Sequence, residues 1–164
     1  MGMPLLLLGL TAMYHAPRDP CALLKPTEIQ ALSPEVKIVA GKLDTTNANI
    51  GAISCDYEWG TGGNAATGKR YLHVILMDAA KTFPGTAPEL IIQGMAAGSN
   101  NPGSVSNPVS GVGQAALFES KSPINAQASS YAKGSVLQVI FEAPDARARK
   151  NQVIGLLKSA VGRL

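Results

Sequence analysis

Residues 53–59 alternate strictly between apolar and polar side chains, and no other pattern constrains the fold as much. Alternation with a period of two is typical of a β-strand that is buried on one face. A glycine-rich stretch at 60–68 follows, and residues 69–78 then form a second, more apolar run. Two neighbouring strands joined by such a loop predict an antiparallel hairpin. Its buried face is expected to carry Cys55 beside Tyr57 and Trp59.

The rest of the chain predicts further strands and several helices around this hairpin. Strands are expected at residues 115–119, 126–133 and 135–142, with a turn at Gly134. Helices are expected where proline or acidic residues precede apolar residues at helical spacing, at 26–32, 87–97 and from Pro144 to the end of the chain. Stretches rich in turn-forming residues are interpreted as loops, at 41–51 and 98–108, and a short strand is considered at 36–40.

These elements predict an α+β fold, an antiparallel sheet of about five strands with packed helices, including a C-terminal amphipathic helix. The chain has 164 residues, so a single domain over 17–164 is expected. Hydrophobic residues make up 46% of the chain, which excludes wholesale disorder. No apolar run reaches the roughly 18–20 residues that a membrane-spanning helix needs.

Residues 1–16 differ from the rest of the chain. An apolar block from Pro4 to Leu10 is followed by the small residues Ala12 and Ala16. This order is typical of the hydrophobic and cleavage regions of a secretory signal peptide, although no charged residue precedes Arg18. We therefore expect a partial signal peptide, and hence a secreted or periplasmic protein. The alternative is an apolar arm that docks on the folded domain.

The two cysteines, Cys21 and Cys55, bear on the same question. An exported protein usually oxidises an even number of cysteines, whereas a cytosolic one keeps them as thiols. Their spacing matches no zinc-ligand pattern, and neither belongs to a CxxC motif. The sequence therefore predicts a Cys21–Cys55 disulfide. The residues before Cys21 do not form the small, apolar motif that lipid anchoring requires.

The positive charge of the chain is confined to its C-terminal segment. Residues 143–164 carry five basic side chains and one acidic one, a net charge of +4, so the other 142 residues of this +3 chain carry −1. Nucleic-acid binding usually combines a dense basic patch with stacking aromatic residues, and residues 143–164 contain no aromatic residue. Nucleic acid is therefore not an expected partner. The basic residues are interpreted as the solvated side of the last helix.

A glycine-rich stretch from Gly63 to Arg70 resembles a phosphate-binding P-loop. That loop needs Ser or Thr after its lysine and must open a helix, because backbone N–H groups at the helix start hold the phosphates. Here Arg70 follows Lys69, and a strand is expected at once. We interpret the stretch as a hairpin loop. No cofactor and no metal site is predicted from the residue types and their spacing.

A second candidate for catalysis rests on His73 and three carboxylates. His73 lies in the middle of the second expected strand. Separately, the hairpin would bring Asp56, Glu58 and Asp78 near one another, and paired carboxylates can perform acid–base chemistry when their environments separate their pKa values. Asp56 and Glu58, however, lie on the polar side of an alternating strand, where solvated side chains are the simpler interpretation. Catalysis by a small hydrolase is kept as an alternative, and no catalytic residue is assigned.

One loop has an open interpretation. Gly111, Val112, Gly113 and Gln114 precede an expected strand, and glycines on both sides of an apolar residue indicate positive φ or a close backbone approach. A turn that aims the next strand is the structural interpretation. A loop that approaches a ligand is the functional one.

Together these segments resemble a bacterial family of small exported, often lipid-anchored proteins of unknown function. The resemblance rests on Asp19-Pro20-Cys21-Ala22-Leu23-Leu24, Cys55-x-Tyr57, the Gly111-Val112-Gly113-x-Ala115 turn and the Gly134 hairpin with Leu137 and Val139. It covers most of residues 19–164, but Lys25 replaces a usual threonine, Gln114 replaces a usual acid, and the lipid-anchoring motif is missing. The resemblance implies export, a disulfide between the two cysteines and an α+β sandwich-like domain. It implies no catalytic residue.

These observations favour a non-enzymatic extracytoplasmic domain, either a binding module or a structural part of the bacterial envelope. Its expected partner is an unidentified protein or a small apolar ligand. The alternatives are the hydrolase described above and a lipid-binding protein, which the apolar strands at 72–77 and 136–141 suggest.

Overall fold

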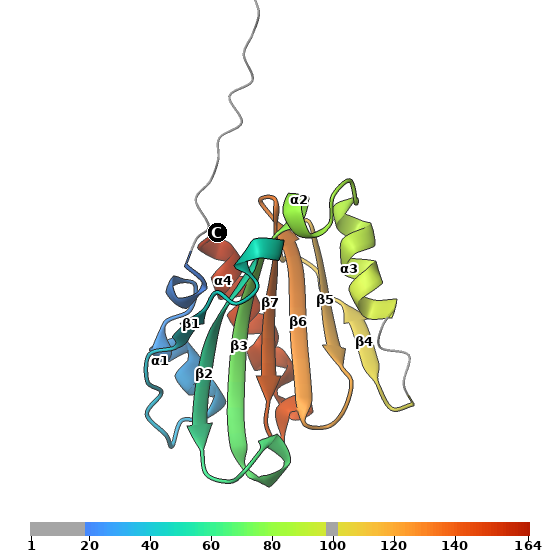
Figure 1. Ribbon diagram of the computed structural model, residues 1–164. Coiled ribbons are helices and arrows are strands. Elements are labelled where there is room, and N and C mark those ends of the chain that lie inside the picture. Colours follow the sequence, from blue (N-terminus) through green and yellow to red (C-terminus); the bar gives the residue numbers. More distant parts are fainter. Residues whose placement is uncertain (1–18, 98–101) are drawn as a thin grey trace, which may run out of the picture.

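The predicted hairpin forms β2 (Ala52–Gly60) and β3 (Lys69–Asp78), which pair antiparallel along their whole length in the computed structural model. The structure describes residues 19–97 and 102–164, so the expected signal peptide or apolar arm at 1–16 lies outside the described residues. The hairpin belongs to one antiparallel sheet with the order β1-β2-β3-β7-β6-β5-β4 (Figure 1). The remaining strands are β1 (Lys42–Asp44), β4 (Val105–Pro108), β5 (Ala115–Ser120), β6 (Asn125–Ala132) and β7 (Ser135–Glu142).

The described sheet has seven strands, so the prediction of about five is wrong. All five expected strands are present, and the two additional ones are the edge strands β1 and β4. Both lie in stretches rich in turn-forming residues, which predict loops, and with three and four residues they are too short to show a clear alternating pattern. Residues 36–40, where a short strand was considered, form no strand.

The edges of the sheet resist further strand pairing. Val109 N–H donates to the Ala116 carbonyl at 3.0 Å, so the alternating ladder turns the backbone of Pro108 outward. Pro108 has no N–H to offer a further strand. The other edge, β1, is three residues long and carries the charged residues Lys42 and Asp44. Short, charged or proline-bearing edges are how proteins avoid edge-to-edge association.

The helices fall near their expected positions. The first is split into α1 (Pro26–Ile29) and the 3-10 turn η2 (Gln30–Leu32), and it follows a 3-10 turn, η1 (Pro20–Ala22). The second is α3 (Pro88–Ala97), preceded by the short α2 (Ala79–Thr82). The last is α4 (Lys150–Gly162), which begins after the 3-10 turn η5 (Ala146–Arg149). Two further 3-10 turns are η3 (Ala48–Ile50) and η4 (Ala65–Thr67).

One face of the sheet, here called the covered face, carries the main hydrophobic core. The segment η1–α1–η2 and α4 pack on it, and α4 lies behind the sheet in Figure 1. Cys55, Tyr57 and Trp59 are all buried there, which confirms the phase predicted for β2. Trp59 stacks on Phe141 and donates its indole N–H to Ser33 Oγ at 2.8 Å. The buried indole therefore has its polar group satisfied.

The opposite side, here called the open face, is turned toward the viewer in Figure 1. A smaller apolar cluster lies at one end of it, where Ile91 of α3 packs with Met77 and Val136. Toward the other end of β2, β3 and β7, the strands show no helix over them (Figure 1). The open face is therefore covered by a helix at one end only.

The predicted disulfide is present between Cys21 and Cys55, with their Cα atoms 5.0 Å apart. It ties η1 to the centre of β2 across 34 positions of sequence, and Cys55 is fully buried. The chain passes close over this bond at Gly41, where an added Cβ would lie 2.3 Å from Cys55 Sγ and 2.7 Å from the Tyr57 ring. Only glycine fits this passage without a shift of its neighbours.

The basic C-terminal residues are less solvated than expected. Arg70 and Arg149 both donate to Asp145, at 2.8 Å each. Burial alone would raise the pKa of the Asp145 carboxyl, but the hydrogen bonds and positive charges of these two arginines together lower that pKa. Arg147 donates to Ser120 Oγ and to the Gly103 carbonyl. Lys150 bonds Asn107 at 2.9 Å and lies over the Phe118 ring. The hydrogen bonds of Asp145, Arg147 and Lys150 therefore hold the C-terminal segment against the sheet.

Candidate functional site

A chain of buried polar side chains crosses β5, β6 and β7 on the open face. Glu119, Ser129 and Gln138 are 1%, 0% and 8% exposed. Gln127 Nε2 donates to Glu119 Oε2 at 3.4 Å and to Ser129 Oγ at 3.2 Å, and Gln138 Nε2 donates to the same Ser129 Oγ at 3.2 Å. We call these four residues the polar network. Burying polar side chains costs free energy, whereas burying apolar ones does not. The surface around this network is therefore a candidate binding site.

An apolar groove of about 590 Å³ lies next to this network, between α3 and the strands β4 and β5. Its volume is in the range of about 300–1,000 Å³ that is usual for small-molecule sites. Most of its lining is apolar: Ile92, Ala96, Pro108, Val109, Ala115, Ala116 and Leu117. Glu89, Gln93 and Ser106 supply the polar lining, and Ser106 is the cross-strand neighbour of Glu119. The lining contains no basic side chain, so the groove suits a neutral or cationic molecule better than an anion.

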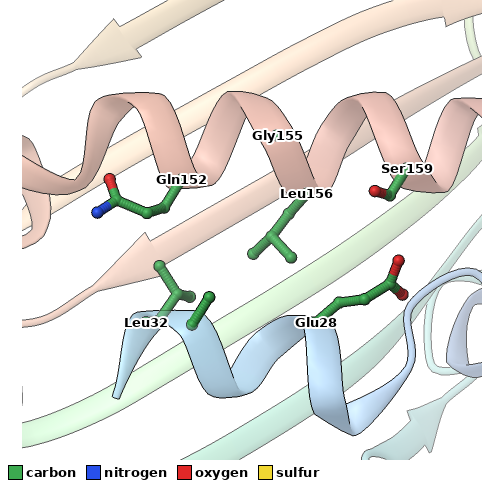
Figure 2. A pocket seen from close by; sticks show the side chains of 7 residues that line it. Glu28, Leu32, Gln152, Gly155, Leu156 and Ser159 are labelled. Atoms are coloured by element: carbon green, nitrogen blue, oxygen red, sulfur yellow. The ribbon is translucent and has the colours of Figure 1, made fainter. Parts of the chain in front are cut away.

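A second, smaller groove of about 290 Å³ lies on the other side of the molecule, between η2–α1 and α4. Figure 2 shows Leu32 and Leu156 pointing toward each other across it, with Glu28 and Gln152 along the same groove. Glu28 is engaged in an ion pair with Arg163, with Oε1 2.8 Å from Nη2. The floor of this groove belongs to the main core. We therefore interpret this groove as the junction between packed helices and not as a binding site.

The structure brings His73 and Asp56 together, a contact that the sequence did not predict. They are cross-strand neighbours on β3 and β2, and His73 Nδ1 lies 2.8 Å from Asp56 Oδ1. Both side chains are 34% exposed. Ser54 Oγ donates to the same Asp56 oxygen at 3.2 Å, so the serine contacts the acid and not the histidine. This pair has the bonding of an oriented base, without an adjacent nucleophile in the described residues.

The other two candidate carboxylates lie elsewhere. Glu58 is paired with Lys69 at 2.5 Å. Asp78 lies at the far end of β3, about 17 Å along the strand from His73 at the usual rise per residue. There it accepts hydrogen bonds from the backbone N–H groups of Ala80 and Lys81 and caps α2. The three carboxylates therefore do not form one cluster.

The loop at residues 111–114 is bound to the neighbouring hairpin. Val112 is buried in the main core, and its carbonyl accepts a hydrogen bond from Ser130 Oγ at 3.2 Å. Gln114 N–H donates to the Tyr131 carbonyl at 2.9 Å. Gly113 has φ +61°, and an added Cβ would lie 2.3 Å from Ser130 Oγ. These contacts favour the structural interpretation, a turn that aims β5, and residues 111–114 do not line either groove.

The stretch with P-loop-like spacing forms the loop between β2 and β3, as predicted. Asn64 caps the 3-10 turn η4, with its side chain accepting from Thr67 N–H at 3.2 Å. Strand β3 begins directly afterwards at Lys69. No α-helix starts at this loop to direct N–H groups toward a phosphate, so the mechanism of a P-loop does not apply here.

The sequence did not single out the polar network. Gln127 and Ser129 share one face of their strand, as do Gln138 and Ile140, and this alternation was visible in the sequence. The missing information was the register, which places Glu119 opposite Gln127 and Ser129 opposite Gln138. Register between strands depends on contacts across the sheet and is not encoded in one strand alone.

Comparisons with known proteins add no further assignment. No family model matches the chain, and neither a curated protein nor a solved structure matches it. Within residues 19–97 and 102–164, no helix is long and apolar enough to cross a membrane. The same residues hold no group of three or more His, Cys, Asp or Glu side chains arranged to bind a metal ion. The fold and its two faces are therefore the basis for any function.

Proposed function

We propose that this protein is an extracytoplasmic, non-enzymatic binding domain that takes an apolar ligand into the groove between α3 and β4–β5. The observation that carries the proposal is the groove itself, which is apolar over most of its lining and ends beside the buried polar network. Binding sites commonly combine an apolar lining with a few polar groups that orient the ligand. The disulfide supports an oxidising compartment outside the cytosol.

The charges around the groove narrow the ligand class. Glu89 lines the groove, and Glu119 is paired across the strands with the lining residue Ser106. Two carboxylates near one apolar site disfavour a ligand with its own carboxylate. We therefore expect a molecule without negative charge, and propose a neutral one with an alkyl or ring body and a hydrogen-bonding end.

The test is an NMR titration of the whole chain with 1-octanol and, separately, with octanoate. Octanol should shift the amide signals of Ile92, Ala96 and Leu117, and octanoate should bind at least about tenfold more weakly. Ala96→Phe fills the groove and should abolish the octanol shifts. Leu90→Phe is the matched control, because Leu90 lies on the same helix and is 60% exposed away from the groove. Equal binding by the Ala96→Phe variant, with its fold intact, would refute the proposal.

A second candidate, a small hydrolase, is favoured by the 2.8 Å contact between His73 and Asp56. The carboxylate would orient the ring so that its other nitrogen, Nε2, can accept a proton from water. Nε2 has no hydrogen bond within the described residues. Hydrolysis of ester, phosphoester and glycoside substrates should be compared between the wild type and His73→Ala. Activity that the substitution removes would favour the enzyme over the binding domain.

A further inference from the structure

A flat aromatic surface lies on the open face, away from the groove. The rings of Tyr71 and His73 are parallel to within 8°, with centroids 6.3 Å apart. Both side chains are only partly buried, as is Ile140, the neighbour of His73 on β7. A sheet face exposed to water usually carries polar side chains. Tyrosine is instead enriched at the centres of protein interfaces.

Carboxylates border this aromatic surface on both sides. Glu58 on β2 and Glu142 on β7 are the two cross-strand neighbours of Tyr71, and Asp56 is a neighbour of His73. On these three strands the surface holds three carboxylates and one ammonium group, that of Lys69, which gives a net charge of −2 when His73 is neutral. Lys42 lies beyond Asp56, on the edge strand β1. The surface between β2 and β7 is therefore complementary to a cation.

Glu142 is the one of the three carboxylates whose charge is not balanced. Asp56 contacts His73, and Glu58 contacts Lys69. Glu142 is partly buried, and within residues 19–97 and 102–164 it takes part in no ion pair or side-chain hydrogen bond. A partly desolvated carboxylate beside an aromatic ring is stabilised most by a positively charged hydrogen-bond donor that also stacks on the ring.

We propose that the Tyr71–His73 surface is a docking site for an arginine side chain presented by a protein partner. A guanidinium group is planar, so it can lie on the Tyr71 ring and at the same time donate two hydrogen bonds to the Glu142 carboxylate. An ammonium group would satisfy the charge without the stacking. This site does not depend on the groove between α3 and β4–β5, so either can exist without the other.

A second copy of the chain does not supply this arginine from its described part. Arg70 and Arg149 are bonded to Asp145, Arg147 to Ser120 and Gly103, and Arg163 to Glu28. Using any of them would break a contact that holds α4 or α1 in place. The occupant that we propose is therefore a different polypeptide, and sedimentation, described below, tests a second copy, whose Arg18 lies outside the described residues.

The test uses two blocked tripeptides, acetyl-Gly-Arg-Gly-amide and the same peptide with citrulline, which has the shape of arginine but no charge. In NMR titrations at low salt, the arginine peptide should shift the signals of Tyr71, His73 and Glu142. Citrulline should bind about fivefold more weakly, and Glu142→Gln or Tyr71→Leu should each weaken the arginine peptide about fivefold. Glu35→Gln, at an exposed carboxylate outside the site, is the matched control and should change nothing.

Three results would overturn the proposal. The first is an arginine peptide that shifts none of these signals, and the second is equal affinity for the citrulline peptide or for the Glu142→Gln variant. The third concerns a second copy of the chain. Sedimentation should show a monomer, and a dimer that Tyr71→Glu dissociates would mean that the surface is covered by the chain itself.

Discussion

At the scale of single residues, Gly41 sets how closely the chain passes over the disulfide. A Cβ at this position would lie 2.3 Å from Cys55 Sγ and within 2.8 Å of two atoms of the Tyr57 ring. Both neighbours are buried and one is covalently held, so neither can move aside easily. Overpacking of this kind typically costs about 1–3 kcal/mol.

We therefore expect Gly41→Ala to lower the free energy of unfolding by about 1–3 kcal/mol. Urea denaturation followed by circular dichroism measures this difference directly. Gly63→Ala is the matched control, because an added Cβ at Gly63 has no atom within 4 Å. Equal stability of the two variants would show that the passage over the disulfide has room for a methyl group.

At the scale of elements, the sequence predicted what local patterns encode. Alternation and apolar runs predicted the five inner strands, and helical spacing predicted α4. Each of these elements is buried on at least one face, which produces a recognisable hydrophobic pattern in the sequence. The edge strands β1 and β4, with three and four residues, are too short to show a periodic pattern in the sequence. The sequence also did not predict the polar network on β5, β6 and β7. Its side chains come into contact only because of the register between these strands, which no single strand encodes.

The contact between α1 and α4 depends on an ion pair. The two terminal nitrogens of Arg163, Nη1 and Nη2, donate to the Glu28 carboxylate at 2.9 and 2.8 Å, and Nη1 also donates to the Leu23 carbonyl. The hydrogen bonds from Arg163 are the main reason that the pKa of Glu28 is lowered from its usual 4.5, with burial opposing them. A carboxyl group whose pKa is lower in the folded state stabilises the fold above its unfolded-state pKa.

The stabilisation by Glu28 is therefore complete at neutral pH and is lost as the pH falls below about 4.5 through the lowered pKa. We expect the difference in free energy of unfolding between the wild type and Glu28→Gln to be constant from pH 7 to 5. It should then shrink as the pH is lowered to 3. Urea denaturation at each pH gives this difference, with Glu35→Gln as the control at an exposed site. A difference that grows toward pH 3 would contradict the assignment of the pair.

At the scale of the whole molecule, the two faces of the sheet carry different kinds of side chains. The covered face carries the core, the disulfide and both helical segments that pack on them. The open face carries the polar network, the His73–Asp56 pair and the Tyr71 surface. The proposed docking surface of Tyr71 and His73 thus lies on the opposite face from the main core, so substitutions at its partly exposed residues can test binding with little effect on folding.

The disulfide holds the covered face together covalently. It closes a loop of 34 positions and holds η1 on β2, so on the chain-entropy model it should stabilise the fold by about 3–4 kcal/mol. We expect a reducing agent to lower the free energy of unfolding of the wild type by about this amount. The double variant Cys21→Ala/Cys55→Ala should be equally weak and insensitive to reductant, which separates loss of the bond from other effects of the reagent. Mass spectrometry of alkylated, unreduced protein should find no free thiol, and two alkylated cysteines would overturn both the bond and the oxidising compartment it implies.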